Sequence, residues 1–283
     1  MKKVETLTFN SEYFDALSTL ECGQIFRFSS LEKGYLVLSK DKGAILHTEN
    51  NQTTIKCLSE DKEYFQNFFD LNRDYKTIVD SAKSENIAIL SQATESGKGI
   101  RILNQDKEET LFSFIISQNN NIPRIKGIIE RLCRELGEKK EFLGQVYYTF
   151  PSAQKMAEKN LLFYQSIGLG YRAKYIKNLA ESINNGLNLQ DFESLNTKEL
   201  RKNLLSILGV GKKVADCVLL FGFHKSDSFP VDTWIEKVYK EDFKGEIKDR
   251  AKISDYLVDR FKENSGYFQQ YLFYHKRQIE KKD

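Results

Sequence analysis

The sequence contains few of the residues that form metal centres or disulfide frameworks. Its 283 residues include four cysteines, three histidines and three prolines. The cysteines are far apart, at Cys22, Cys57, Cys133 and Cys217, and this spacing fits neither a disulfide framework nor a zinc knuckle. It also differs from the tight cysteine cluster that holds an iron–sulfur centre. We therefore expect an intracellular protein that holds no metal.

The sequence also lacks a long hydrophobic run and a large net charge. No apolar stretch approaches membrane-spanning length, and the polar residues that follow Met1 do not form a signal-peptide core. We expect no membrane partner and a cytoplasmic location, at the nucleoid if the source is bacterial. The formal net charge is only +3, so binding to a nucleic acid would depend on where the lysines and arginines lie.

A change in hydrophobic period divides the chain. The first part has short β-branched or aromatic runs separated by Gly, Asn, Asp and Lys, which is typical of antiparallel strands joined by turns. These runs span residues 21–28, 34–39, 44–48 and 53–58. From Glu63 onward, apolar residues recur at helical spacing. We therefore expect an α+β protein with an antiparallel β domain over residues 1–72 and a helical region over 73–283.

The most specific pattern is a pair of helices joined by a tight turn. Residues 197–207 and 212–221 have helical periodicity, and the turn between them contains Gly209 and Gly211. Glycine allows positive φ and close approach of the backbone to a ligand. The unpaired N–H groups at the start of the second helix suit a phosphate oxygen. The pattern therefore predicts a helix-hairpin-helix that binds a phosphodiester backbone.

An amine and a carboxylate accompany this hairpin. Lys213 lies at the start of the second helix, and Asp232 follows the segment Phe229-Pro230-Val231. A lysine at such a position is usually a solvated surface charge, as we expect for Lys212. Asp232 also fits the N-cap of a helix that begins at Thr233. The joint spacing of the hairpin, the amine and the carboxylate nevertheless favours an active site.

Three further stretches have two interpretations each. In residues 111–124 a helix ends in the carboxamides of residues 118–121, which indicates either a polar turn or side chains that, with Arg124, hydrogen-bond to base edges in DNA. Residues 167–175 place an aromatic side chain beside two cations at a glycine turn. This pattern indicates either an aromatic wedge between DNA bases or a second helix–turn–helix with a core tyrosine. Residues 266–273 place Gln269 and Phe273 on one helix face, as in any amphipathic helix. The residues alone leave these alternatives open.

Six short motifs occur along the chain in the order ECGQIFRF, FSFIISQNNNIPRI, GLGYRAKY, GVGKKVADC, FPVDTW and GYFQQYLF. In this order they resemble the motifs of the 8-oxoguanine DNA glycosylase/lyase family in the helix-hairpin-helix superfamily. The resemblance extends over most of the chain. It implies an N-terminal antiparallel sheet followed by two mainly helical subdomains, with the active site in their cleft. It also implies a monomer that binds double-stranded DNA containing 8-oxoguanine and needs no cofactor, with room for a monovalent cation at the hairpin.

The resemblance assigns roles to residues at the active centre. Lys213 matches the nucleophile of the family, and Asp232 matches its carboxylate. Cys217 and Phe273 match the two residues that sandwich the flipped base. Gln269 matches the residue that reads the Watson–Crick edge of that base.

Further roles concern the lesion and the DNA around it. Gly23 matches a glycine whose backbone carbonyl accepts a hydrogen bond from N7–H, a proton that 8-oxoguanine has and guanine lacks. Gly209 and Gly211 match the glycines that face the phosphate. The residues that fill the gap in the duplex and hold the orphaned cytosine match Asn119, Arg124, Tyr171 and Arg172.

Two positions depart from the pattern of the eukaryotic members. Leu208 stands where those proteins have a proline before Gly-Val-Gly, which alters the rigidity of the turn but leaves its glycines in place. Trp234 stands where they have a histidine that contacts a phosphate. The resemblance therefore assigns no role to Trp234.

The implied reaction requires the target base to leave the stack, at a cost of a few kcal/mol. Lys213 would then attack C1′ as a free amine while Asp232 stabilises positive charge on the sugar. The resulting Schiff base permits β-elimination of the 3′ phosphate. Two alternatives are a monofunctional alkylated-base glycosylase and a non-enzymatic DNA-binding module. Lys213 argues against the first, and Asp232 with the long β domain argues against the second.

Overall fold

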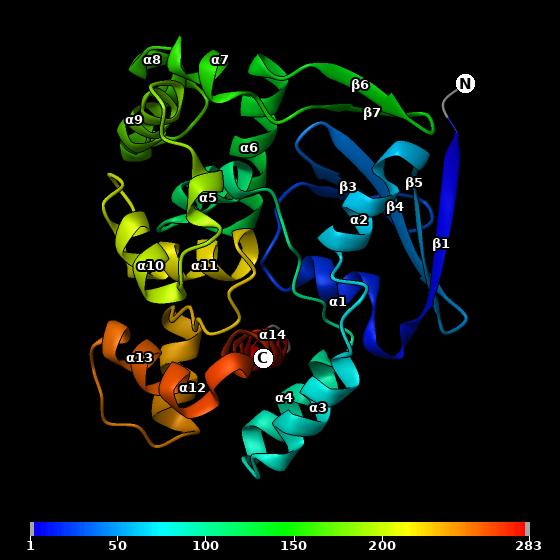
Figure 1. Ribbon diagram of the computed structural model, residues 1–283, viewed down its shortest axis with the longest axis vertical. Helices are drawn as coiled ribbons and strands as arrows, with labels where there is room; N and C mark the ends of the chain where they lie inside the picture. The colour runs from blue at the N-terminus through cyan, green and yellow to red at the C-terminus, as the bar shows by residue number, and fades with distance from the viewer. Residues whose placement is uncertain (1–2, 281–283) are drawn as a thin grey trace.

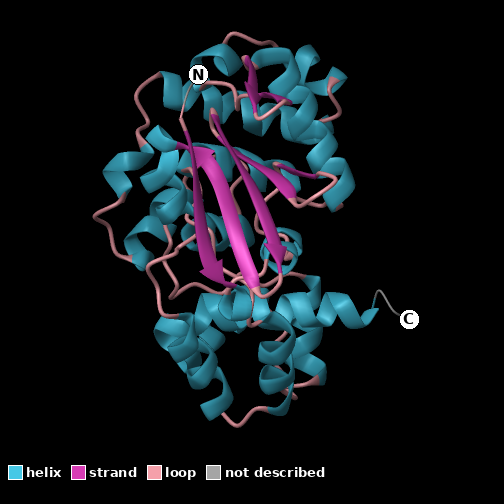
Figure 2. Cartoon of the chain, turned by 90° about the vertical axis from the view of Figure 1, so that its right-hand side faces the viewer, coloured by secondary structure: helices cyan, strands magenta, loops and turns pink. Residues whose placement is uncertain are grey.

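The computed structural model describes residues 3–280, and its N-terminal part is built on one antiparallel sheet. The five strands lie in the order β1-β5-β4-β3-β2, with their inner face against a core that includes Val37, Leu46 and Ile55. The predicted α+β class with an N-terminal antiparallel sheet is therefore confirmed (Figures 1 and 2). The strand bounds are β1 Val4–Asn10, β2 Phe28–Ser30, β3 Tyr35–Ser39, β4 Lys42–Glu49 and β5 Gln52–Leu58.

The strand predicted over residues 21–28 is wrong for most of its length. Helix α1 (Ala16–Glu21) occupies its start, and only β2 at its end joins the sheet. The buried side chain of Gln24 holds the intervening segment, because its Nε2 donates to the carbonyls of Thr19 at 2.9 Å and Arg101 at 2.7 Å. Contacts with a segment far along the chain thus replace the pairing that local pattern suggested. Strand β1 was not predicted.

The rest of the chain is mainly helical. The predicted helix-hairpin-helix is confirmed, with α10 and α11 on either side of a short turn. The helices are α2 Lys62–Phe68, α3 Tyr75–Ser84, α4 Ala88–Gly97, α5 Lys107–Ser117, α6 Ile122–Leu136, α7 Ala153–Ala157, α8 Leu161–Ser166, α9 Ala173–Asn184, α10 Thr197–Leu205, α11 Lys212–Gly222, α12 Thr233–Glu241, α13 Arg250–Phe261 and α14 Ser265–Glu280. The domain boundary near residue 72, which falls between α2 and α3, stays a prediction.

A β-hairpin interrupts the region that we expected to be helical throughout. It consists of β6 (Lys139–Phe142) and β7 (Gln145–Tyr148). Leu143 and Gly144 form its turn and both have positive φ, at 49° and 77°, a conformation typical of two-residue hairpin turns. Phe142 and Tyr147 pack against Leu36 of the larger sheet, so the hairpin gains its stability from a distant element.

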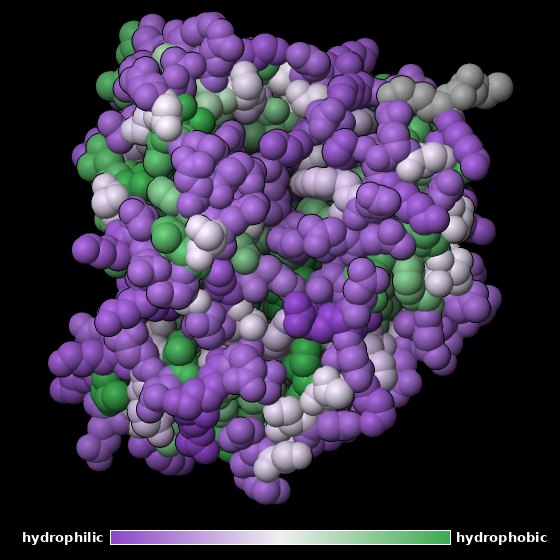
Figure 3. All heavy atoms as spheres, in the orientation of Figure 1, coloured by the Kyte–Doolittle hydropathy of each residue, from purple (hydrophilic) through white to green (hydrophobic). Residues whose placement is uncertain are grey.

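Two helical groups lie beside the sheet in Figure 1. One contains α5 to α11, and α11 lies buried between α5 and α10. The other contains α3, α4, α12, α13 and α14, and α14 appears end-on near its centre. Among the described residues, none of the helices combines the length and the apolar character needed to cross a membrane. The face in Figure 3 is largely hydrophilic, with scattered hydrophobic side chains.

We expect Gly97→Ala to destabilise the fold although alanine favours helices. A Cβ at Gly97 would lie 2.9 Å from Cδ1 of Tyr271, whose ring is buried between α4 and α14, and such overpacking costs about 1–3 kcal/mol. Gly127→Ala in α6 is the matched control, because its Cβ would approach only the end of the Arg131 side chain. That variant should gain about 0.5–1 kcal/mol. Thermal melting of both variants tests this, and equal shifts would contradict it.

Candidate active site

The turn between α10 and α11 requires a glycine at one position. Gly209 has a φ of 88°, and a Cβ there would lie 2.4 Å from Cγ of Tyr175. Gly211 is the N-cap of α11, and none of the described side chains caps it. The first N–H groups of α11 are therefore available to a ligand oxygen. Gln118 ties this turn to the end of α5, because its Nε2 donates to the Gly209 carbonyl at 2.9 Å.

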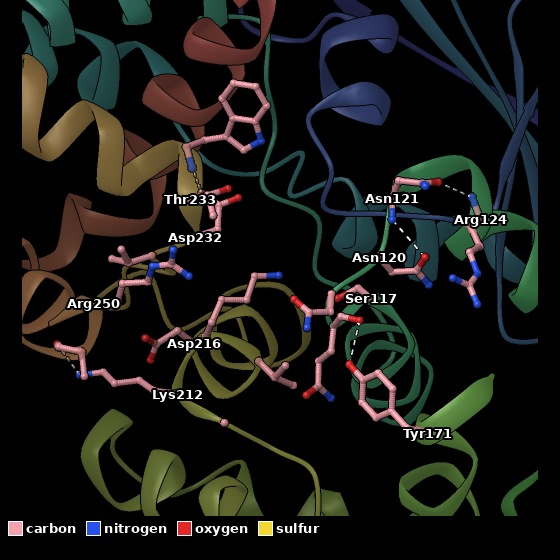
Figure 4. A pocket seen from close by; sticks show the side chains of 18 residues that line it. Ser117, Asn120, Asn121, Arg124, Tyr171, Lys212, Asp216, Asp232, Thr233 and Arg250 are labelled. Carbon is pink, nitrogen blue, oxygen red and sulfur yellow. Dashed lines mark hydrogen bonds between the residues drawn. The ribbon is translucent and has the colours of Figure 1, made fainter. Parts of the chain in front are cut away.

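The two adjacent lysines at the start of α11 have different environments. Lys212 donates to the Ala251 carbonyl at 2.9 Å and pairs with Asp255, so its ammonium is committed to α13. Figure 4 shows Lys212 directed away from Ser117 and the asparagines. Lys213 forms no ion pair within the described residues, and its Nζ lies 5.2 Å from the ring centroid of Phe114. Of the two lysines, Lys213 is thus the one whose ammonium has no carboxylate partner among the described residues.

Asp232 caps a helix and also lines both cavities of the site. It is the N-cap of α12, and its Oδ1 accepts hydrogen bonds from the backbone N–H groups of Trp234 and Ile235, both at 3.0 Å. The predicted N-cap is therefore confirmed. The residue is also half-buried and lines the same cavities as Lys213. Helix capping holds this carboxylate in place beside the amine.

Two adjoining cavities meet at Lys213 and Asp232. One has a volume of about 910 Å³ and the other about 450 Å³. Figure 4 shows the larger one, with Asp232 and Asp216 on one side and the asparagines with Tyr171 on the other. The residues that line both cavities are Ser117, Asn120, Asn121, Lys213, Asp232 and Trp234. An amine and a carboxylate at this junction can act on one molecule that enters both cavities.

The loop after α5 forms the far wall of the larger cavity. Asn119 is exposed there with a φ of 49°. Half-exposed Tyr171 donates to the Gln118 carbonyl at 3.4 Å. Arg124 is exposed, and its Nη2 donates to the Gly168 carbonyl at 3.3 Å. These three predicted residues therefore face one cavity, while their contacts with DNA stay predictions.

We expected Arg172 to help hold the orphaned cytosine, but it is not among the residues that line this cavity. It is only 3% exposed. Its guanidinium donates to the backbone carbonyls of Gln118 and Leu169, and to that of Asn119 at 2.9 Å. In this structure the charge of Arg172 orients the loop that carries Asn119. It contacts the ring of Tyr171 at 4.5 Å from the centroid, so it also positions that aromatic side chain.

The four residues predicted to contact the base fall into two pairs. Gly23, with a φ of 85°, and Phe273 line the smaller cavity, and a Cβ at Gly23 would lie 3.1 Å from Cε1 of Phe273. Cys217 and Gln269 are buried and are not among the residues that line either cavity. Burial raises the pKa of the Cys217 thiol to about 11, which keeps it neutral. Gln269 donates to the Pro230 carbonyl at 3.2 Å.

Several lining residues were not singled out from the sequence. Phe114 lies beneath the Lys213 amine, and Asn121 caps α6 by accepting from the Arg124 backbone N–H at 3.0 Å. Arg277 lines the smaller cavity one turn after Phe273. The four-residue spacing from Phe273 was a usable signal for Arg277, since residues so spaced share a helix face. No local pattern indicated Phe114.

The fold and this site define a helix-hairpin-helix protein of base excision DNA repair. Residues 6–111 match the family model of the 8-oxoguanine DNA glycosylase N-terminal domain. Residues 112–263 match that of the HhH-GPD superfamily base excision DNA repair protein. The chain belongs to the 8-oxoguanine DNA glycosylase family within that superfamily.

Individual relatives agree with this assignment. A probable N-glycosylase/DNA lyase of Methanothermobacter thermautotrophicus is 31% identical over 78% of this chain and 76% of its own length. The N-glycosylase/DNA lyase of Saccharomyces cerevisiae is 33% identical over 74% of this chain, which spans 60% of that protein. The Clostridium acetobutylicum 8-oxoguanine glycosylase/lyase, solved with double-stranded DNA containing cytosine opposite 8-oxoG, has 36% identity and a TM-score of 0.92. The match covers 99% of this chain and 98% of that one.

We expect the two hairpin glycines to differ when each is changed to alanine. Gly209→Ala should lower the melting temperature, because the side chain would meet the Tyr175 ring at positive φ. Gly211→Ala should not, because a Cβ there has no atom within 4 Å. It should instead weaken duplex binding, since the methyl group would stand where a phosphate approaches the helix. Melting and duplex-binding titrations measure both effects. Unchanged affinity of Gly211→Ala would place the phosphate elsewhere.

Proposed function

We propose that the protein excises 8-oxoguanine from duplex DNA as a bifunctional DNA glycosylase and lyase. The observation that carries the proposal is the placement of Lys213 at the junction of two cavities, with no ion pair in the described part of the chain and Asp232 on the same cavity walls. The amine provides a nucleophile, and the carboxylate provides the negative charge that a developing cation needs.

Each cavity accommodates one part of the substrate. The larger takes the DNA backbone, which the N–H groups at the start of α11 bind. Tyr171 and Asn119 lie across it and fill the gap that the base leaves. The smaller takes the flipped base, which stacks on Phe273. Flipping costs a few kcal/mol, which the stacking of Tyr171 and of the base offsets.

The chemistry then proceeds on the sugar between the cavities. The lone pair of Lys213 Nζ attacks C1′, and the bond from C1′ to the base breaks with its electron pair going to the base. Asp232 stabilises the positive charge on the sugar as that bond breaks. Loss of a proton and opening of the sugar ring give a Schiff base between the lysine and C1′. Removal of a C2′ proton then expels the 3′ phosphate by β-elimination.

The alternatives fit the site less well. A monofunctional glycosylase activates water with aspartate and requires no amine at this place. Lys213 nonetheless lines both cavities, whereas its neighbour Lys212 lines only the larger one and is held by α13. A module that only binds DNA requires the hairpin but not the smaller cavity. The described site contains both the Lys213 amine and the smaller cavity, as a glycosylase with lyase activity requires.

We expect Lys213→Gln to abolish base excision and borohydride trapping on duplex DNA containing 8-oxoguanine, while duplex binding persists. Glutamine keeps the length of the side chain but has no nucleophilic amine. Lys212→Gln is the matched control and should retain trapping, because that ammonium is paired with Asp255. Single-turnover excision and gel detection of the covalent adduct measure both. Loss of trapping in Lys212→Gln alone would reverse the assignment.

We expect Asp232→Asn to separate stability from chemistry. Asparagine caps helices nearly as well as aspartate, so the variant should lose at most about 1 kcal/mol of stability. The excision rate should fall by about a hundredfold or more, because the charge near the sugar is lost. Denaturant unfolding and single-turnover rates measure the two effects. A large loss of stability with normal rates in the folded fraction would make the carboxylate purely structural.

We expect faster excision of 8-oxoguanine opposite cytosine than opposite adenine, by about tenfold or more. Arg124 offers donors to O2 and N3 of an orphaned cytosine, and the Asn119 carboxamide accepts from its amine. Adenine has no matching pair of acceptors, and a buried unpaired donor costs about 1–3 kcal/mol.

Single-turnover rates on the two duplexes test this preference, and Arg124→Ala should reduce it. Arg134→Ala is the control, because Arg134 is an exposed residue of α6 that pairs with Glu130 and lines neither cavity. Equal rates on the two duplexes, or a preference that survives Arg124→Ala, would place Arg124 on the DNA backbone.

A further inference from the structure

One cation on the wall of the smaller cavity has no role in the reaction described above. Arg277 lies in α14, one turn after Phe273, and lines the cavity together with Gly23. Its Nη1 donates to the backbone carbonyl of Glu21 at 3.3 Å, and its Cζ lies 5.2 Å from the Phe273 ring centroid. These two contacts fix the guanidinium at the cavity edge.

The guanidinium retains unused hydrogen-bonding capacity. Arginine has five N–H donors, and the described residues provide one acceptor for them, the Glu21 carbonyl. None of the described carboxylates forms an ion pair with it. The other side chains of this cavity include Phe26, Phe114 and Ile125. Apolar side chains beside it provide no competing acceptor, so the guanidinium can donate a charge-assisted hydrogen bond to a ligand.

The position of Arg277 relative to Gly23 indicates which acceptor it would meet. Its Nη1 is 3.5 Å from the point that a Cβ on Gly23 would occupy. If the Gly23 carbonyl accepts from N7–H of the flipped base, as the family resemblance implies, the atoms next to N7 face this arginine. In 8-oxoguanine the carbonyl oxygens on C6 and C8 lie on either side of N7, and both are acceptors.

We propose that Arg277 binds the flipped base by donating a hydrogen bond to a carbonyl oxygen beside N7 of the purine. The inference rests on the proposed function and deepens it. Arg277 and the Gly23 carbonyl together form a donor and an acceptor that match the oxygen and the N7–H of an 8-oxopurine. The Phe273 ring lies beside both residues, since a Cβ at Gly23 would be 3.1 Å from its Cε1 and the Arg277 Cζ is 5.2 Å from its centroid.

A comparison of two substrates tests this role. Single-turnover excision is measured on duplex DNA with 8-oxoguanine opposite cytosine, and lyase cleavage on the same duplex with an abasic site, which has no base. We expect Arg277→Met to lower base excision by about tenfold or more, because a hydrogen bond to a charged group is lost. Lyase cleavage should stay within about twofold of the wild-type rate. Arg277→Gln, which keeps two donors, should recover part of the excision rate.

The ratio of excision to lyase rate in each sample decides the outcome, and it does not depend on how much of a variant is folded. Arg134→Met is the control and should leave the ratio unchanged. If Arg277→Met lowers both rates equally, the arginine binds a phosphate or supports the fold, and the proposal is wrong. An unchanged ratio with full excision also overturns it. Failure of the proposed function is distinct, because the wild-type protein would then lack both activities.

Discussion

The buried carboxylate of Asp216 fixes the helix on which the site depends. It lies in α11 and is fully buried, and it accepts from Arg201 of α10 at 2.8 Å and from Ser254 of α13 at 3.2 Å. Burial raises its pKa, and the Arg201 guanidinium opposes that shift. Removal of one partner from such a buried pair typically costs about 3–5 kcal/mol. One side chain thus sets the angle of α11 against two neighbouring helices.

This arrangement explains why two adjacent lysines differ. Lys212 adds a second attachment between α11 and α13, through the Ala251 carbonyl and Asp255. Because both Asp216 and Lys212 hold α11 against α13, the next side chain in sequence is directed to the cavities. Asp232 enters the same space from the start of α12, where it caps the helix. The fold therefore positions the amine and the carboxylate through contacts that are themselves structural.

The sequence was a good guide to elements with local signals. Helix α10 begins with a capping box formed by Asn196 and Glu199, and the hairpin contains Gly209 at positive φ. Both features depend on neighbours within a few residues, so their residue types are informative. The same holds for Asp232, whose cap bonds reach only two and three residues ahead. The resemblance of short motifs to those of the glycosylase/lyase family then indicated which residues take part in the chemistry.

Features that depend on distant contacts were not predictable in this way. The segment around Gln24 resembled a strand, but its conformation depends on hydrogen bonds with Arg101 and Leu103. The predicted DNA contact of Arg172 stays a prediction, but no local pattern indicated that its guanidinium donates to carbonyls of a loop more than fifty residues earlier in the chain. Gly23 and Phe273 lie side by side although they come from opposite ends of the chain.

Peptide mapping of a trapped adduct would identify the reacting amine. Wild-type protein would be reduced with borohydride on duplex DNA containing 8-oxoguanine, digested, and sequenced by mass spectrometry. We expect a single modified residue, Lys213. An adduct on Lys212, on the N-terminal amine or on any other lysine would contradict it, and so would active base excision that leaves no adduct.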